Sequence, residues 1–199
     1  MSRHPITQAQ WKAVSCLPLI NSPLIPSPSK LQGIDHPVES ISWHDAVEFC
    51  KRLSRKSGKK YRLPTEIEWE YACRAGTTTK FHFGDFIDIK FANFFDEENS
   101  CVNSSKGTTP VSSFEFPNSF GLYDMHGNVY EWCLHRWHKK FKKTAASDEF
   151  EEDSSESSIR VVRGGSWRDN SSGCQSSHRS KRSSDDKADF IGFRVICLI

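Results

Sequence analysis

The sequence has few of the features that mark membrane-spanning, secreted or nucleic-acid-binding proteins. No stretch of its 199 residues approaches the roughly 20 apolar residues needed to span a bilayer. The N-terminal MSRHPITQAQW lacks the apolar run of a signal peptide. The formal net charge is only +2. We therefore expect neither a membrane nor a nucleic acid as a partner.

Closely spaced metal-ligating residues are also lacking. The seven cysteines are odd in number, and no two of them form a CxxC pair or a zinc-like spacing. The eight histidines form no HExxH motif. We therefore expect no catalytic metal. The cysteines are predicted to be reduced thiols that mostly serve as packing residues in a cytoplasmic protein.

Three helices are predicted in the first part of the chain. Thr7 and Gln10 have the capping-box spacing that begins a helix. A second helix, over about 42–56, has an apolar stripe and Ser at its N-cap. A third begins at Thr65 and stops at Gly76. These local signals predict that all three helices lie before residue 76.

The rest of the chain is predicted to form loops and short strands. Five prolines mark 16–37 as loop. Beyond residue 76, short aromatic pieces alternate with turn residues, which is typical of strands. These pieces include KFHFGD, FANFFD, GNVYEWCLHRW, IRVVRGGSW and IGFRVICLI. Residues 139–158 hold four lysines and then six acidic residues, and are predicted to be a flexible charged insertion.

Two sets of charged residues are predicted to have structural roles. Glu66, Glu68 and Glu70 are expected to cap the third helix and to form salt bridges, because residues two apart on a helix do not share a face. Three arginines near the last strands are expected to anchor these strands to buried carboxylates. They are Arg163, Arg179 and Arg194.

Four segments occur in a specific order: YRLPTEIEWEYACRAGT, FGLYDMHGNVYEW, VVRGGSW and IGFRV. Together they resemble the formylglycine-generating-enzyme, or sulfatase-modifying-factor, domain family over nearly the whole chain. The resemblance implies one α+β domain over 1–199 with a C-type lectin-like fold. Such a fold has two to three helices, a small twisted antiparallel sheet and much loop. The family has a strand before the PITQAQW-like motif, so we expect it to be missing or supplied by an upstream domain or partner chain.

The resemblance also raises the question of enzyme activity. Enzymes of this family oxidise a substrate cysteine with oxygen and copper, and use two cysteines shortly after the GGS-aromatic motif. Paired soft thiolates suit Cu(I). Here the first of those positions falls near Asp169, and Cys174 is the only cysteine available. His178 lies four residues on, but nothing else supports a nucleophile–base pair. We therefore interpret the chain as non-catalytic, without copper, and Cys174 as a buried packing thiol.

The C-terminal stretch of the chain is similar to the corresponding region in a second branch of the family. The variable proteins of diversity-generating retroelements have RGGSW, then runs of Asn broken by fixed residues, then IGFR. Residues 167–190 match this template pattern without a gap. This resemblance implies a variable ligand-binding region. The fixed positions are held by Cys174, Ser176, Arg179, Asp185 and Ile191.

The residues at the template's Asn positions fit this interpretation. The retroelement mutates template adenines, so AAC becomes NNC, which cannot encode Lys, Glu, Gln, Met or Trp. None of these five types occurs at the twelve matching positions. With Trp167 added, the predicted ligand-binding residues are Trp167, Arg168, Asp169, Asn170, Gly173, His178, Ser180, Arg182, Ser183, Asp186, Ala188, Asp189 and Phe190. Such a surface suits loops and exposed strand faces on a rigid frame.

The segment DMHGNVYEW has two interpretations. The family often holds a structural calcium here, and by position its ligands would be the side chains of Asp124 and Glu131 and the carbonyls of Gly127 and Val129. Calcium prefers such hard oxygen donors. Alternatively, Asp124 caps the turn, Gly127 takes a positive φ and Glu131 pairs with an arginine. The sequence leaves both open.

Three functions follow from these observations. The first, which we favour, is a non-catalytic protein that displays a diversified surface to a protein or small ligand. The second is a cysteine oxidase of the formylglycine-generating type with an unusual site. The third is a fixed structural or regulatory module docked onto a kinase or protease partner.

Overall fold

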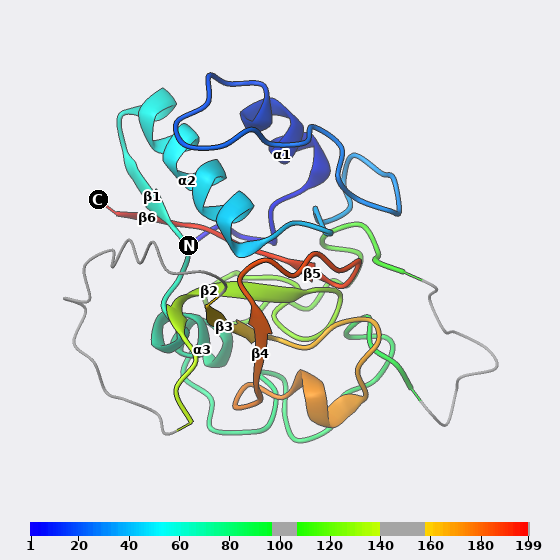
Figure 1. Ribbon diagram of the computed structural model, residues 1–199. Helices are drawn as coiled ribbons and strands as arrows, with labels where there is room; N and C mark the ends of the chain where they lie inside the picture. Colours follow the sequence, from blue (N-terminus) through cyan, green and yellow to red (C-terminus); the bar gives the residue numbers. More distant parts are fainter. Residues whose placement is uncertain (97–106, 140–157, 199) are drawn as a thin grey trace.

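The computed structural model describes residues 1–96, 107–139 and 158–198 (Figure 1). Apart from its two ends, the predicted insertion at 139–158 lies outside these ranges. The helices are α1 (Gln8–Ser15), α2 (Trp43–Ser57) and α3 (Glu66–Arg74), with a 3₁₀ turn η1 (Ser171–Cys174). The strands are β1 (Lys60–Arg62), β2 (Tyr130–Arg136), β3 (Ile159–Arg163), β4 (Arg179–Ser183), β5 (Ile191–Gly192) and β6 (Ile196–Leu198).

All three predicted helices are confirmed, and each begins at its predicted cap. The side chains of Thr7, Ser42 and Thr65 each accept a hydrogen bond from the backbone N–H three residues later. α2 ends at Gly58, whose left-handed φ of 71° suits glycine. α3 ends at Ala75, a non-glycine residue with a φ of 45°. None of the helices in the described ranges is long and apolar enough to cross a bilayer.

The strands form two sheets. Four of them lie in the order β4-β3-β2-β5, and β1 pairs with β6 in a separate two-stranded sheet. The predicted antiparallel arrangement holds for every pair except β2 and β5, which are parallel. The chain reaches β5 by the loop that follows β4, on the far edge of the sheet, so no hairpin forces β5 to run against β2.

Several aromatic segments are not strands, contrary to the prediction. KFHFGD contributes one isolated bridge, between Phe81 and Gly84, and the described part of FANFFD is loop. Their rings pack among themselves instead: those of Phe81 and Phe83 stack with centroids 5.6 Å apart. The alternation of aromatic and turn residues therefore belongs to a loop rather than to strands. This loop has a small core of its own, in which Phe81 and Phe94 are buried.

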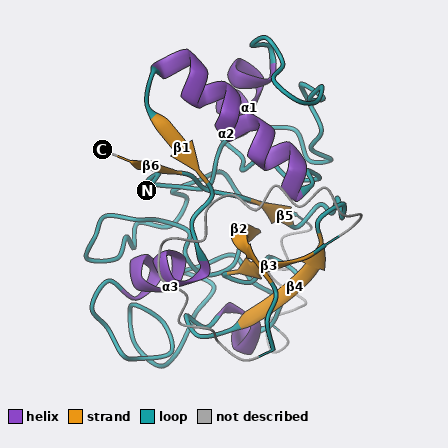
Figure 2. Cartoon of the chain, turned by 60° about the vertical axis from the view of Figure 1, so that its left-hand side comes forward, coloured by secondary structure: helices purple, strands orange, loops and turns teal. Residues whose placement is uncertain are grey.

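The four-stranded sheet lies between two cores. Trp132 and Val162 face α1 and α2, whereas their neighbours Cys133 and Val161 face α3. Successive residues of a strand point to opposite faces, so β2 and β3 are buried on both sides. Figures 1 and 2 show α1 and α2 on one side of this sheet and α3 on the other.

The N-terminal residues pair with the end of the chain. The backbone N–H of Ser2 donates to Val195, and that of Ile6 donates to Phe193. Both termini therefore lie near β1 and β6 (Figure 1). Completion of a further strand by an upstream domain or partner chain stays a prediction.

Truncation of the larger core should be costly. Phe49 is 1% exposed and its ring packs against Trp11 and Phe193, with centroids 5.5 and 5.1 Å away. Phe49→Ala is expected to lower the free energy of unfolding by about 3–5 kcal/mol, because it leaves a cavity among these rings. Urea denaturation measures the change.

Phe86 offers a control of the same chemistry, since its side chain is 88% exposed. Phe86→Ala should change the free energy of unfolding by no more than about 0.5 kcal/mol. Equal losses in the two variants would contradict this assignment of the core.

Candidate ligand-binding surface

The predicted variable stretch leaves β3 through a close-packed glycine turn. Gly164 and Gly165 both take positive φ values, 95° and 72°. A Cβ on Gly165 would lie 2.6 Å from the sulfur of Cys174 and 2.8 Å from the carbonyl oxygen of Gly173. Only glycine fits here, because the backbone passes against η1. This turn sets where the stretch begins.

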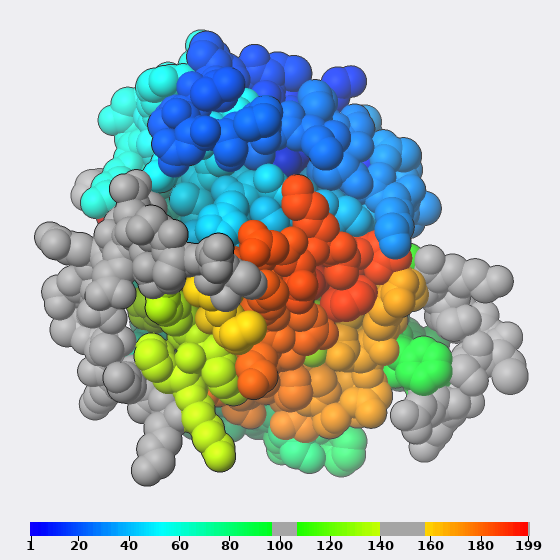
Figure 3. Space-filling view, viewed as in Figure 1, coloured from blue at the N-terminus to red at the C-terminus, as the bar shows by residue number. Residues whose placement is uncertain are grey.

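Burial separates three of the five fixed residues from the predicted ligand-binding residues. Of the thirteen predicted ligand-binding residues, twelve are half-buried or exposed and Gly173 is buried. The fixed Cys174, Ser176 and Ile191 are all 0% exposed. Two fixed residues depart from this pattern: the side chain of Arg179 is 20% exposed, and that of Asp185 is 64% exposed and lies 3.6 Å from His44. Figure 3 shows the exposed part of the C-terminal stretch, coloured orange to red, as one continuous area of the surface.

Gly173 does not fit the prediction of an exposed contact residue. It lies in η1, and a Cβ there would meet Cβ of Asp169 at 2.9 Å. Diversification at this position therefore requires Asp169 to shift. The other twelve predicted residues are half-buried or exposed. Their role in binding stays a prediction.

Aromatic rings and arginines from four segments meet at this face. The guanidinium of Arg168 lies 4.4 Å from the ring centroid of Trp167 and 5.3 Å from that of Phe190. The guanidinium of Arg182, on β4, lies 5.6 Å from Phe190 and 5.7 Å from Tyr130. These distances are within the range of cation–π attraction. The ring of Phe190 is thus shared by both arginines.

Tyr130 supports the surface from below, a role that the sequence analysis missed. It is 2% exposed on β2, and its hydroxyl donates to Oδ1 of Asp169 over 2.9 Å. Burial and the Asp169 charge raise the pKa of Tyr130, so the phenol stays protonated and donates. Its place in an apolar strand segment indicated only packing.

Asp189 links the surface to the proline-rich loop. Its carboxylate accepts from Arg168 at 2.8 Å and lies 3.4 Å from Nζ of Lys30. Its backbone carbonyl accepts from Nε1 of Trp167. No sequence signal placed Lys30 here, since 159 residues separate it from Asp189.

The remaining predicted residues lie on β4 and in turns. Ser180 and Ser183 are on β4, opposite Val162 and Ile159 of β3. Other contacts stay within short turns: Asn170 accepts from Ser172, Asp186 accepts from the N–H of Ser183, and His178 donates its N–H to Gln175. Ala188 accepts from the backbone of Ser40. Burial lowers the pKa of His178.

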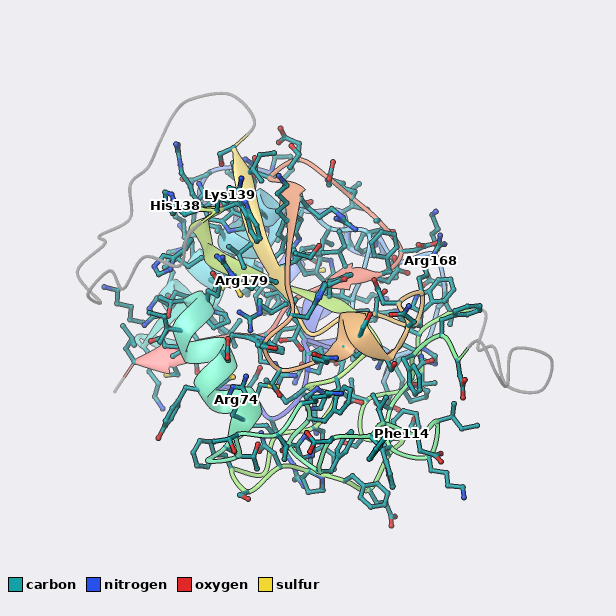
Figure 4. The ribbon with its side chains drawn as sticks, turned by 90° about the horizontal axis from the view of Figure 1, so that it is seen from below. Arg74, Phe114, His138, Lys139, Arg168 and Arg179 are labelled. Carbon is teal, nitrogen blue, oxygen red and sulfur yellow. The ribbon has the colours of Figure 1, made fainter. Side chains whose placement is uncertain are left out.

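The predicted arginine anchors are confirmed, and a carboxylate on α3 holds two of them. Arg163, which is 0% exposed, bonds Glu66 and Glu70 at 2.7 Å each. Arg179 bonds the same Glu66 at 2.6 Å. Arg163 also donates to the carbonyl oxygen of Ser176. Figure 4 shows Arg179 between α3 and β4, with Arg168 on the far side of β4.

The third anchor bears on the calcium question. Arg194 donates to both carboxylate oxygens of Glu131, at 2.6 and 2.7 Å, and Trp69 donates to the same carboxylate. Its guanidinium also lies 3.0 Å from the carbonyl oxygen of Tyr123 and 3.5 Å from that of Asp124. The guanidinium therefore takes up both carboxylate oxygens of Glu131, one of the four predicted calcium ligands.

The residues predicted for calcium have protein partners or a defined turn conformation in this arrangement. Gly127 has a φ of 80°, and a carboxylate oxygen of Asp124 accepts from the N–H of Ser112. Val129, the residue before β2, is buried. The described residues hold no group of three or more His, Cys, Asp or Glu side chains suited to a metal. The interpretation in which Glu131 pairs with an arginine is confirmed, and calcium stays a prediction.

Cys174 lies beneath the surface as a packing residue. It is 0% exposed, beside Gly165 and at the end of η1. Burial, and then the charge of Asp169, raise the pKa of its thiol well above the usual range. Metal binding and nucleophilic attack both need the thiolate, so this environment suits neither.

Loss of the shared carboxylate on α3 should destabilise the protein. Glu66→Gln leaves the buried Arg163 and its neighbour Arg179 without this charge. We expect the free energy of unfolding to fall by about 3 kcal/mol, the cost of breaking a buried ion pair. Glu115 is exposed, and Glu115→Gln is the control, with a change within about 0.5 kcal/mol. A Glu66 variant as stable as the control would contradict this role.

Calcium removal should leave the stability unchanged, because Arg194 already neutralises Glu131. The thermal unfolding midpoint is expected to be the same in excess calcium and in excess EDTA. A midpoint that rises with calcium in the wild type but not in Asp124→Asn would restore the calcium interpretation.

Comparison with known proteins places this geometry in a family. The model of the sulfatase-modifying factor enzyme 1-like domain matches residues 1–199. Formylglycine-generating enzyme of Mus musculus is 34% identical, over 96% of this chain and 49% of the relative. Inactive C-alpha-formylglycine-generating enzyme 2 of Bos taurus is 28% identical, over 96% of this chain and 56% of the relative. The chain spans about half the length of these curated relatives.

Solved structures share the fold. Treponema denticola variable protein 1 is 26% identical with a TM-score of 0.74, covering 98% of this chain and 82% of its own. PvdO from Pseudomonas aeruginosa is 31% identical with a TM-score of 0.80, covering 100% and 79%. One neighbour is thus a variable protein, as the resemblance to the second branch implied. The predicted α+β fold is confirmed, and the chain belongs to the sulfatase-modifying factor enzyme 1-like domain family.

Proposed function

We propose that this chain is a non-catalytic ligand-binding protein that displays a diversified C-terminal surface. One observation carries the proposal: exposure follows the template. Residues at fixed positions such as Cys174 and Ile191 are fully buried, whereas all predicted variable residues except Gly173 reach the surface. An ordinary surface loop gives no reason for burial to coincide with a retroelement template.

The frame around this surface suits diversification. A surface that tolerates many side chains cannot contribute to the core, so its anchors must come from the scaffold. Arg163 and Arg194 flank the stretch, and their partners Glu66 and Glu131 lie outside it. Changes at the variable positions therefore leave both anchors in place, which is the arrangement typical of binding loops on rigid scaffolds.

The oxidase alternative draws on the identity to formylglycine-generating enzymes. Against it stand the residues after the GGS motif. The first expected cysteine position falls near Asp169, whose carboxylate accepts from Tyr130, and the thiol of Cys174 is buried and protonated. A copper site of two thiolates has no second ligand in this stretch. The relatives also include an inactive member.

The test is to sequence the DNA around the gene. We expect a near-copy of the DNA for Trp167–Ile191, rich in AAC codons, beside a reverse transcriptase gene. Mismatches between the two copies should fall at template adenines and, in the protein, at the twelve predicted variable positions. That pattern follows from adenine-directed mutagenesis.

Absence of the repeat would contradict the proposal. A fixed interaction module would then be favoured by a partner whose binding survives scrambling of 168–190. Copper binding that is lost in Cys174→Ser would instead favour the oxidase.

A further inference from the structure

The variable surface of this copy has a centre with a defined chemistry. Phe190 lies between two guanidiniums, with Trp167 beside one of them and Tyr130 beside the other. Tyr130 and Phe190 also meet edge to face, with centroids 6.4 Å apart. Trp, Tyr and Arg are the residue types that dominate binding energy at protein interfaces.

The charges at this centre are unevenly neutralised. Arg168 and Lys30 share the single carboxylate of Asp189. Arg182 donates to the backbone carbonyl of Lys181 and has no carboxylate partner among the described residues. Asp169 does not supply one, because its two oxygens accept from Tyr130 and Ser166. Three cations are therefore set against one carboxylate, which Lys30 and Arg168 share, and one Nη of Arg182 is bonded only to a backbone carbonyl.

These features determine which ligand fits. A guanidinium supported by a ring is weakly hydrated and binds carboxylates in two-point geometry. The rings beside it offer apolar contact, which a carboxylate alone does not use. A ligand with carboxylates next to apolar side chains uses both.

The border of the surface argues against a long polyanion. Asp185 and Asp186 are both exposed, next to β4. Lys187 is already paired with Asp45 at 2.7 Å. Polyanions such as nucleic acids gain affinity from many phosphate contacts along a basic track. Here acidic residues adjoin a short basic centre.

We infer that this copy binds an acidic peptide segment of a protein partner, with Arg182 as the main carboxylate receptor and Phe190 and Trp167 as the apolar contacts. The inference rests on the proposed function and names the ligand class for the same surface. Other copies of a diversified surface, with different residues at these positions, would take other ligands.

The probe is a phage-displayed library of random twelve-residue peptides, selected on the full chain. Selected peptides are expected to be enriched in Asp and Glu over the starting library, with aromatic or aliphatic neighbours. Arg182→Ala should weaken the binding of these peptides by about tenfold or more, as for a hot-spot arginine. Arg182→Lys should restore it only in part, since an ammonium lacks the planar fork.

Lys12 provides the matched control. It is exposed on α1, and its hydrogen bonds are local, to Ser15 and Cys16, so Lys12→Ala removes the same charge without a contact to the surface and should leave peptide affinity unchanged. Unfolding midpoints equal to that of the wild type show that each variant is folded. Heparin serves as the polyanion competitor and is expected to displace the peptides poorly at physiological salt.

The outcomes separate this inference from the proposed function. Selected peptides without acidic enrichment, but dependent on Trp167 and Phe190, would overturn the acidic ligand and leave a binding surface. Peptides that bind equally to a variant with alanine at 167, 168, 182 and 190 would count against both. Failure to select any peptide, or stronger binding of heparin than of the peptides, would overturn the inference alone.

Discussion

The carboxylate of Glu66 accepts hydrogen bonds from Arg163 on β3 and from Arg179 on β4. It therefore joins α3 to two strands: β3, which precedes the predicted variable stretch, and β4, which lies within it. Burying these charges costs desolvation energy, and the mutual attraction offsets this only when each charge is bonded. The effect is to fix the position of β4 against β3. The residues that do so, Glu66, Arg163 and Arg179, are not among the predicted variable positions.

A second ion pair does the same at the other end of the stretch. Glu131, on β2, binds Arg194, which follows β5. Glu131 also accepts from Trp69 on α3, so both pairs converge on one helix. The two ends of the variable stretch are thus fixed to a common support. Under the proposed function, the loops between them carry side chains selected for binding rather than for folding.

The parts of the fold that could be predicted depend on short-range signals. Thr7, Ser42 and Thr65 predict the starts of their helices, because the side chain of an N-cap residue accepts a hydrogen bond from the backbone N–H three residues later. Strand β4 was not predicted, since its sequence RSKRS has no apolar alternation. It forms because β3 supplies an antiparallel partner over its whole length. For the aromatic segment KFHFGD the prediction of a strand was wrong, because its rings pack within a loop.

The sequence by itself determined the family, the helix caps, the arginine anchors and twelve of the thirteen positions at which the predicted variable stretch reaches solvent. Each of these rests on local spacing or on motifs that can be compared directly. Only the tertiary structure decided which carboxylate each arginine binds, and that Tyr130 and Lys30 belong to the surface. These partners are separated by many residues, 113 between Arg179 and Glu66 and 159 between Lys30 and Asp189. Chain folding, rather than any local pattern, brings such residues together.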